Sequence, residues 1–369
     1  MSSPIAKHPG TKVLVVEDSA VVREFLRDIL DSDPGIEVIG TARDGEEAIE
    51  AVRIKRPHVV TMDINMPKMN GLEATRRIME TTPTPIVIVS GAWDPEDVAT
   101  TFRAIEAGAL TVIQRPAGLG HPDHETTKAR LLRTVKLMAE VKVIRRWAAR
   151  TPGRKREELR VNPREEETAA LSEGFKLLVL GASTGGPVAI QTLLKHLSPE
   201  LPFPLAVVQH MTEGFTRGFA DWLGQTTGFA VHVTAHGEKL APGHVYIAPE
   251  GVHLAVTREM KAALSSEDPE NGLRPSVSHL FRSVAEAFGQ HAIGILLTGM
   301  GRDGAEELKL LRKTGALTFA QDEGSSVVFG MPGEAVKLNG ATHVLPPEKI
   351  AALLNGLIKD QKQGTRREP

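Results

Sequence analysis

Residues 176–186, Lys-Leu-Leu-Val-Leu-Gly-Ala-Ser-Thr-Gly-Gly, join a short apolar run to a glycine-rich turn. The apolar run has the length of a buried β-strand and stops at Gly181. Ser183 follows two residues later, with Gly185 and Gly186 behind it. This spacing is typical of a strand–turn–helix element that exposes a serine hydroxyl, where larger side chains would collide with the turn and the substrate. The segment predicts a reactive serine, with a phosphate-binding loop or a simple helix cap as the alternatives.

The segment opens an alternation of strands and helices that extends to about residue 358. Further strands are expected at 205–209, 244–247, 293–298, 316–320 and 343–345. The first part of the chain has the same pattern, with strands expected at 12–16, 37–41, 59–63, 86–90 and 110–113. Because parallel strands need crossover connections, this order predicts an α/β protein with two doubly wound parallel-sheet domains. In such sheets, reactive groups gather at the carboxyl ends of the strands.

The two patterns are separated by a helical, basic stretch at 126–149 and by residues 151–167, which are rich in Arg, Lys and Glu and lack an apolar face. Such a composition is typical of a solvated linker. We expect a first domain at 11–130, a helical and charged linker at 131–172, a second domain at 173–360 and a polar tail at 361–369.

The composition narrows the class of protein. The 369 residues are 41% hydrophobic and 24% charged, which suits a globular protein with two cores. A net charge of −2 argues against a nucleic-acid-binding role, and the lack of cysteine excludes disulfides and thiol chemistry. Neither a signal-like N-terminal segment nor an apolar run of membrane-spanning length is present. We expect a cytoplasmic monomer that neither binds nucleic acid nor inserts into a membrane.

Acidic residues stand at strand ends in the first half. Glu17 and Asp18 end the first expected strand and Asp63 ends the third, and these two strands are commonly neighbours in a doubly wound sheet. Converging carboxylates need a cation, and oxygen ligands suit Mg²⁺. Ser90 and Arg115 follow the fourth and fifth strands, so a hydroxyl and a cation are expected near the same edge. The alternative is that these acids simply face solvent.

Residues 12–116 resemble a response-regulator receiver domain. The matching residues are Glu17-Asp18, Asp63 followed by Met66-Pro67-Lys68-Met69-Asn70-Gly71, and Ser90. The resemblance implies a flavodoxin-like fold in which Asp63 is phosphorylated from a histidine kinase with the help of Mg²⁺. The implied metal ligands are Glu17, Asp18, Asp63 and the backbone carbonyl of Asn65.

Two positions depart from the receiver pattern. Ser90 and Arg115 are the implied switch residues, but the family normally has lysine where Arg115 stands. Arginine keeps the charge as a planar fork rather than a compact ammonium group, which puts the strength of phospho-signalling in question. Glu17 replaces the commoner aspartate and preserves a carboxylate facing the metal.

Two further residues of the second half could work with Ser183. His210 directly follows a strand, and Asp303 lies in the glycine-rich loop Thr298-Gly299-Met300-Gly301-Arg302-Asp303-Gly304. A serine, a histidine and an aspartate at three strand ends are the parts of an acyl-transfer triad, and N–H groups of the glycine-rich turns could form an oxyanion hole. Spacing alone does not choose His210 over the other histidines, which are His232, His236, His244, His253, His279, His291 and His343.

The same loop also fits a dinucleotide-binding fingerprint. Gly299, Gly301 and Gly304 have the required spacing, and Asp322 ends the next strand. Against this alternative, Asp303 would place a carboxylate at the helix N-terminus where a pyrophosphate must bind.

Residues 175–358 resemble the catalytic domain of the chemotaxis protein-glutamate methylesterases. The matching motifs are Gly181-Ala182-Ser183-Thr184-Gly185-Gly186, Gln209-His210-Met211, Gly214-Phe215-Thr216, Arg274-Pro275-Ser276-Val277, residues 297–304 and Val328-Phe329-Gly330-Met331-Pro332. The resemblance implies a Rossmann-like domain with Ser183 as nucleophile, His210 as base and Asp303 as acid. It also implies oxyanion contacts from the backbone N–H groups of Met300 and Thr184. No cofactor is implied for the esterase reaction.

Together the two resemblances imply a phosphorylation-regulated serine hydrolase of two-component chemosensory signalling. It would demethylate glutamate γ-methyl esters on methyl-accepting chemoreceptors, releasing methanol, and deamidate receptor glutamines as a glutaminase. A chemotaxis histidine kinase would supply the phosphoryl group. A receptor-docking module with an idle triad and a phosphate or nucleotide binder are the other classes of function.

Overall fold

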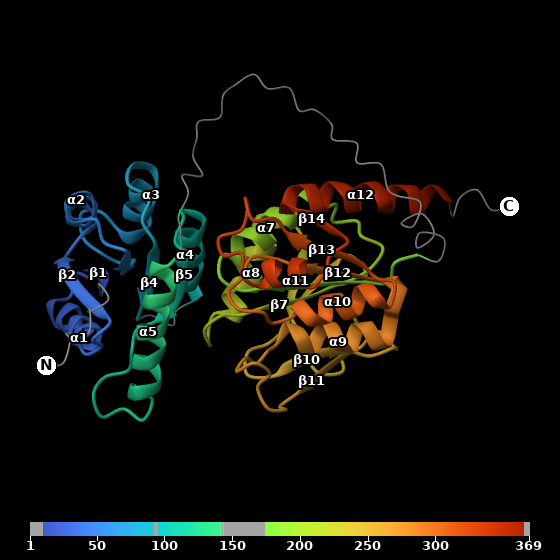
Figure 1. The fold of residues 1–369 in the computed structure, drawn as a ribbon, viewed down its shortest axis with the longest axis horizontal. Helices are drawn as coiled ribbons and strands as arrows, with labels where there is room; N and C mark the ends of the chain where they lie inside the picture. Colours follow the sequence, from blue (N-terminus) through green and yellow to red (C-terminus); the bar gives the residue numbers. More distant parts are fainter. Residues whose placement is uncertain (1–9, 92–94, 142, 144–173, 365–369) are drawn as a thin grey trace, which may run out of the picture. The chain divides into compact units, whose positions relative to one another are not determined.

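The structure is a computed structural model that describes residues 10–91, 95–141, 143 and 174–364. The chain divides into two compact units, Met1–Arg154 and Lys155–Pro369 (Figure 1). Most of the linker expected at 131–172 lies outside the described residues.

The first unit contains a five-stranded parallel sheet. Its strands are β1 (Thr11–Val16), β2 (Ile36–Ala42), β3 (Val59–Met62), β4 (Ile86–Ser90) and β5 (Thr111–Gln114), in the order β2-β1-β3-β4-β5. The helices are α1 (Ala20–Asp31), α2 (Gly45–Lys55), α3 (Gly71–Thr81), α4 (Pro95–Glu106) and α5 (His124–Ala139). Helices α1 and α5 pack together on one face, and α2, α3 and α4 cover the other (Figure 1). The flavodoxin-like order expected from the sequence is confirmed.

Local sequence fixes where three of these helices begin. The side chains of Ser19, Asp44 and Asn70 are N-caps that accept hydrogen bonds from the first-turn N–H groups of α1, α2 and α3. Each cap therefore ends the strand-to-helix loop at a defined residue. As a result, Asp18 lies in a short loop directly after β1, and Asp63 is the first residue after β3.

Helix α5 crosses the domain boundary that we expected after residue 130. Leu131, Val135 and Met138 are buried, and the helix contacts β1, β3 and β4. This helix belongs to the first unit through Ala139, because its apolar side covers the sheet. Similarly, α12 (Pro347–Gly364) continues past residue 360, where we expected the tail to begin.

The second unit is built on a seven-stranded sheet in which all neighbouring strands are parallel. Its strands are β6 (Leu177–Ala182), β7 (Leu205–Gln209), β8 (Ala230–Val233), β9 (His244–Ile247), β12 (Ala292–Leu296), β13 (Leu317–Gln321) and β14 (His343–Leu345). They follow the order β14-β13-β12-β6-β7-β9-β8. A separate antiparallel pair joins β10 (His253–Val256) to β11 (Ala262–Ser265).

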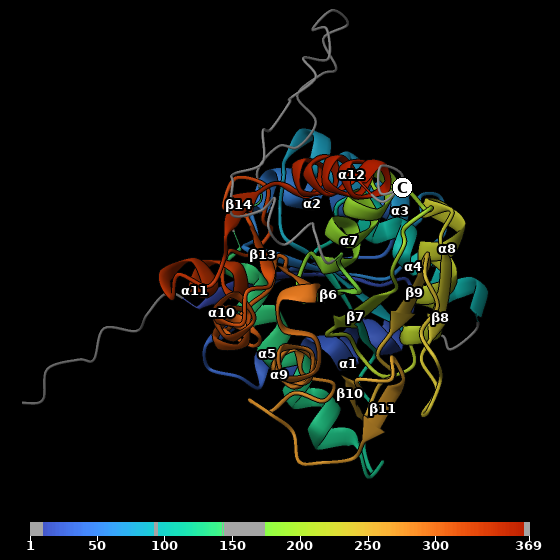
Figure 2. The same ribbon diagram turned by 90° about the vertical axis from the view of Figure 1, so that its right-hand side faces the viewer.

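Helices cover both faces of this sheet. Figure 2 shows α7 (Gly186–His196), α8 (Thr216–Thr227) and α12 on one face and α9 (Val277–Phe288) and α10 (Ala305–Lys313) on the other. A short 3-10 turn, η1 (Gly289–His291), and α11 (Met331–Lys337) complete the unit. Residues of β6, β7, α9 and α10 form one buried apolar cluster on the second of these faces, and every residue of β6 and β7 is buried, so the central strands are covered on both sides. The doubly wound parallel fold predicted for the second half is confirmed.

The order of strands places a switch point beside β6. The chain leaves β6 toward β7 on one side and later returns to β12 on the other. Loops that diverge in this way leave a crevice at the carboxyl ends of the strands, where ligands bind in such sheets. Ser183 directly follows β6 at this crevice.

Candidate active site and phosphorylation site

Ser183 is held by its backbone between two neighbouring strands. Its N–H donates to the carbonyl of Thr298, 3.0 Å away, just beyond β12. Its carbonyl accepts hydrogen bonds from Gln209 Nε2 at 2.9 Å and from the N–H of Gly186 at 2.8 Å. The serine is partly exposed. The structure therefore fixes the main chain at this position and leaves the side chain accessible at the switch point.

The second glycine-rich loop passes directly against this serine. A Cβ added to Gly299 would lie 2.8 Å from Ser183 Cβ and 2.3 Å from Met331 Sδ. The N–H groups of Gly330 and Met331 both donate to the Gly299 carbonyl, at 3.1 and 2.9 Å. Only glycine allows so close an approach, because even a methyl group would overlap both neighbours.

His210 and Asp303 form a bonded pair next to the serine. The His210 N–H donates to the carbonyl of Ala182 at 3.0 Å, which sets the histidine beside the end of β6. His210 Nε2 lies 2.9 Å from Asp303 Oδ2, and the two side chains are 10% and 2% exposed. With Nε2–H donating to the carboxylate, Nδ1 is the ring nitrogen that remains available to other groups. Within the described residues, Ser183 Oγ makes no hydrogen bond to this ring, and catalytic contacts of this kind often tighten only with substrate.

The environment of Asp303 keeps it ionised. Burial alone would raise its pKa, but the hydrogen bond and charge of His210, together with bonds from Ser276 and Val277, hold the pKa well below its ordinary value. The Oδ1 atom accepts from Ser276 Oγ at 2.7 Å and from the Ser278 N–H at 3.2 Å, while Oδ2 also accepts from the Val277 N–H at 2.6 Å. A buried carboxylate with these donors can orient a histidine and balance its positive charge.

The other histidines of the second half have different partners. His232 Nε2 and His244 Nδ1 lie 2.8 Å apart on the edge strand β8 and its neighbour β9, and their rings stack. His253 is fully buried against α9. Within the described residues, His210 is the histidine bonded to Asp303.

The dinucleotide-binding alternative does not fit the loop geometry. The Gly304 N–H, at the start of α10, donates to Ser278 Oγ at 2.9 Å. Asp303 is bonded to the first residues of α9. One N–H group that a pyrophosphate would need is therefore taken by Ser278, and the Asp303 carboxylate at the same helix start would repel the phosphates.

The first unit brings together the acidic residues expected at its strand ends. Single oxygens of Glu17, Asp18 and Asp63 lie within 4.8 Å of one another. Glu17 is 1% exposed, and burial, followed by the charge of Asp63, raises its pKa to about 7 against the opposing effect of Arg115. Three carboxylate donors at this spacing fit Mg²⁺, because the metal would neutralise their mutual repulsion.

Arg115 extends into the same cluster. Its guanidinium lies 3.0 Å from Glu17 Oε2 and 3.9 Å from Asp63 Oδ1. Ser90 is buried at the end of β4, and its carbonyl accepts from the Arg115 N–H at 2.8 Å. Asn65 follows Asp63 by two residues. A Cβ at Gly71 would lie 2.0 Å from the Asp63 carbonyl oxygen, so glycine is required where α3 begins beneath this loop.

Comparisons with known proteins match a family to each of the two units. The CheB methylesterase family matches residues 178–354, and the response regulator receiver domain matches residues 13–121. A protein-glutamate methylesterase/protein-glutamine glutaminase of Geobacter metallireducens is 55% identical over 355 residues, covering 95% of this chain and 99% of that protein. The chain belongs to the protein-glutamate methylesterase/protein-glutamine glutaminase family.

A second relative has the same name. The enzyme of that name from Nitrosospira multiformis is 55% identical and covers 95% of this chain and 97% of its own length. Among solved structures, the Thermotoga maritima CheB methylesterase catalytic domain is 36% identical, with a TM-score of 0.48, and covers 50% of this chain and 98% of its own.

Sequence reasoning missed several residues around the site. Ser276 and Ser278 bond directly to Asp303, and Glu250 Oε2 accepts from the Gly214 N–H at 2.7 Å, which holds the loop after His210. In the sequence, Ser276 stands within the motif Arg274-Pro275-Ser276-Val277. Its position as a serine before an apolar helix is a capping signal, but nothing local indicates that the cap faces Asp303.

Proposed function

We propose that this chain hydrolyses glutamate γ-methyl esters on chemoreceptors, releasing methanol, and also deamidates receptor glutamines. The observation that carries the proposal is the His210–Asp303 pair beside Ser183 at the switch point of the second sheet. The close similarity to enzymes named for these two reactions supports the same chemistry.

The proposed reaction proceeds in two stages. His210 Nδ1 takes the proton of Ser183 as Oγ attacks the ester carbonyl carbon. The tetrahedral intermediate collapses, the C–O bond to the methoxy group breaks, and the imidazolium returns the proton to give methanol. Water, deprotonated by the same nitrogen, then cleaves the glutamyl-serine ester to leave glutamate and free serine. An amide follows the same path with ammonia as the leaving group.

Backbone N–H groups are available for the oxyanion. Within the described residues, the N–H groups of Thr184 and Met300 donate to no protein acceptor. Thr184 is the residue after Ser183. Met300 is the residue after Gly299, and Gly299 lies against Ser183. We propose that these two groups stabilise the negative oxygen of the tetrahedral intermediate.

In the first unit we propose phosphorylation of Asp63 from a histidine kinase. Glu17, Asp18, Asp63 and the Asn65 carbonyl would hold Mg²⁺, which neutralises charge during the transfer. An oxygen of Asp63 attacks the phosphorus, and the bond to the kinase histidine breaks. Ser90 and Arg115 would then respond to the new charge.

Within the described residues, no helix has the length and apolar character to cross a membrane.

Methanol release from a methylated chemoreceptor tests the proposal. Wild type should release methanol, and Ser183→Ala should lose turnover while its circular dichroism spectrum is unchanged. If neither protein releases methanol, the chain is a docking module. Calorimetric binding of phosphate or NAD that survives the substitution would instead support a phosphate or nucleotide binder.

A further inference from the structure

Asp303 is bonded to three consecutive residues at the start of one helix. Besides His210, its carboxylate accepts from Ser276 Oγ, the Val277 N–H and the Ser278 N–H. Ser276 is the N-cap of the 12-residue helix α9. The carboxylate therefore lies at the positive end of a helix dipole, and a side-chain hydroxyl adds a further, directed donor.

The Ser276 hydroxyl has two partners at once. It accepts from the His279 N–H at 3.4 Å, which caps α9, and donates its own proton to Asp303 Oδ1 at 2.7 Å. Ser276 is 0% exposed, so no water competes for either bond. Because an ionised carboxylate only accepts hydrogen bonds, the hydroxyl proton lies between Ser276 Oγ and Asp303 Oδ1.

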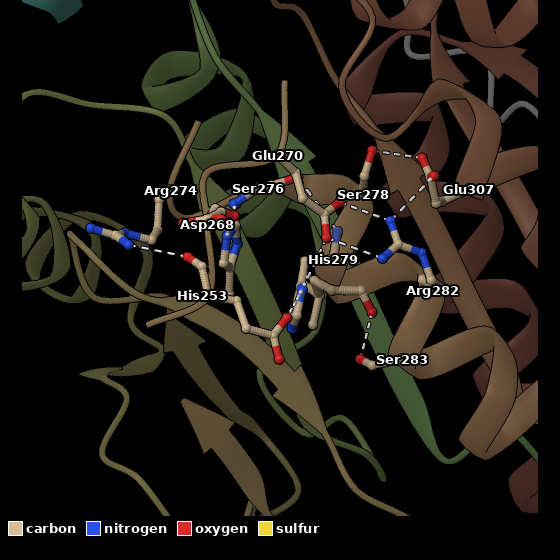
Figure 3. A network of polar contacts seen from close by, with 12 residues as sticks. His253, Asp268, Glu270, Arg274, Ser276, Ser278, His279, Arg282, Ser283 and Glu307 are labelled. Carbon is tan, nitrogen blue, oxygen red and sulfur yellow. Dashed lines mark hydrogen bonds and ion pairs between the residues drawn. The ribbon is translucent and has the colours of Figure 1, made fainter. Parts of the chain in front are cut away.

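A buried histidine fixes the backbone of Ser276. The Ser276 N–H donates to His253 Nδ1 at 3.3 Å, and His253 Nε2 lies 3.1 Å from the carbonyl of Asp268 (Figure 3). Since Nδ1 accepts, Nε2 carries the proton and the ring is neutral. His253 is 0% exposed and stacks on His279 with ring centroids 4.6 Å apart. The ring thus ties β10 to the first turn of α9.

A second set of contacts holds the other side of the same turn. Ser278 Oγ donates to Glu307 Oε2 at 2.6 Å and accepts from the Gly304 N–H. Arg282 lies 3.7 Å from Glu307 and forms two hydrogen bonds with Glu270, at 3.0 and 2.7 Å (Figure 3). These bonds connect α9 to α10, the helix that follows Asp303. The turn that carries Ser276 therefore cannot shift without breaking contacts on both sides.

We propose that Ser276 is a positioning residue for the hydrolysis, whose hydroxyl aims the Asp303 carboxylate at His210 and is itself held by His253. This inference rests on the proposed function. The charged and titratable groups around the carboxylate include His210, which is bonded to it directly. The others reach it through Ser276 or Ser278, and they are Glu307, Arg282, Glu270, His253 and His279.

Three variants of the full chain test the proposal: Ser276→Ala, Ser276→Thr and Ser283→Ala. Ser283 is the matched control, because it lies on the same helix but its hydroxyl donates to the Leu280 carbonyl and accepts from the Val256 N–H of β10, with no bond to Asp303. The measurement is kcat and KM for methanol release across pH 5 to 9, with thermal unfolding of each variant.

Ser276→Ala should lower kcat about 10- to 100-fold with little change in KM, as expected for a lost hydrogen bond to a charged group. The acid limb of its kcat–pH profile should also move to higher pH. A carboxylate that accepts one hydrogen bond fewer stabilises the positively charged His210 ring more strongly. Ser276→Thr should restore the profile. Ser283→Ala should keep both kcat and the acid limb of wild type.

A purely structural role for Ser276 predicts a different result. The lost cap would lower the melting temperature by about 2–4 °C in Ser276→Ala, with the pH profile unchanged. That outcome, or equal losses in Ser283→Ala, would overturn the inference. If wild type released no methanol, the proposed function itself would fail. The wild-type assay therefore separates the two failures.

Discussion

At the scale of single residues, the lowered pKa of Asp303 leads to a prediction about acid stability. A carboxyl group whose pKa is lower in the folded than in the unfolded protein stabilises the fold at pH values above the unfolded pKa. This stabilisation is lost as the pH falls toward the folded pKa. In Asp303→Asn, the unfolding midpoint should therefore vary less with pH below about 4 than in wild type. We expect kcat at neutral pH to fall about 10⁴-fold, because an amide cannot balance the imidazolium. A pH series of thermal unfolding and one kinetic assay measure both effects. Equal acid sensitivity of the two proteins would contradict this account.

Arg115 leads to a second prediction at this scale. Its guanidinium contacts Glu17 and approaches Asp63, so its positive charge opposes a cation at the proposed metal site. Arg115→Ala should raise the affinity for Mg²⁺ several-fold in titration calorimetry without a phosphodonor. Arg43→Ala is the control, since Arg43 pairs with Glu47 on the surface. Unchanged or weaker Mg²⁺ binding in Arg115→Ala would show that the guanidinium does not oppose the metal.

At the scale of elements, the close contact between two loops predicts the effect of a single methyl group. Gly299→Ala places a Cβ within 2.8 Å of Ser183 Cβ, so the loop or the serine must move. We expect kcat to fall more than about tenfold, together with a loss of about 1–3 kcal/mol of stability. Gly324→Ala is the matched control, because its nearest neighbour would be Asp322 Oδ2 at 3.9 Å. A Gly299→Ala enzyme with wild-type kcat and melting temperature would refute the steric argument.

The elements also show what the sequence could and could not predict. The central strands were predictable because each is a continuous apolar run buried on both faces, as in β6 and β7. The sequence pattern did not predict the edge strand β8 or the β10–β11 pair. Strand β8 is exposed or partly exposed along its length, and its one polar–apolar alternation is too short to distinguish a strand from a loop. The positions of Ser183, His210 and Asp303 at strand ends were visible. The contacts of Asp303 with Ser276 were not, because the two residues are 27 positions apart and only the packing of α9 brings them together.

At the scale of the whole molecule, the two units have separate sheets and cores, so signalling must couple one fold to the other. The family resemblance implies that phosphorylation of Asp63 raises esterase activity. A small phosphodonor with Mg²⁺ should therefore increase methanol release by wild type but not by Asp63→Asn. Deletion of residues 1–170 should give a fragment with high activity that does not respond to the phosphodonor, because the proposed catalytic residues Ser183, His210 and Asp303 all lie in the second unit and Asp63 is removed. Equal basal activity of the fragment and the full chain would show that the first unit does not restrain the second. Stimulation of Asp63→Asn would place the phosphorylated residue elsewhere.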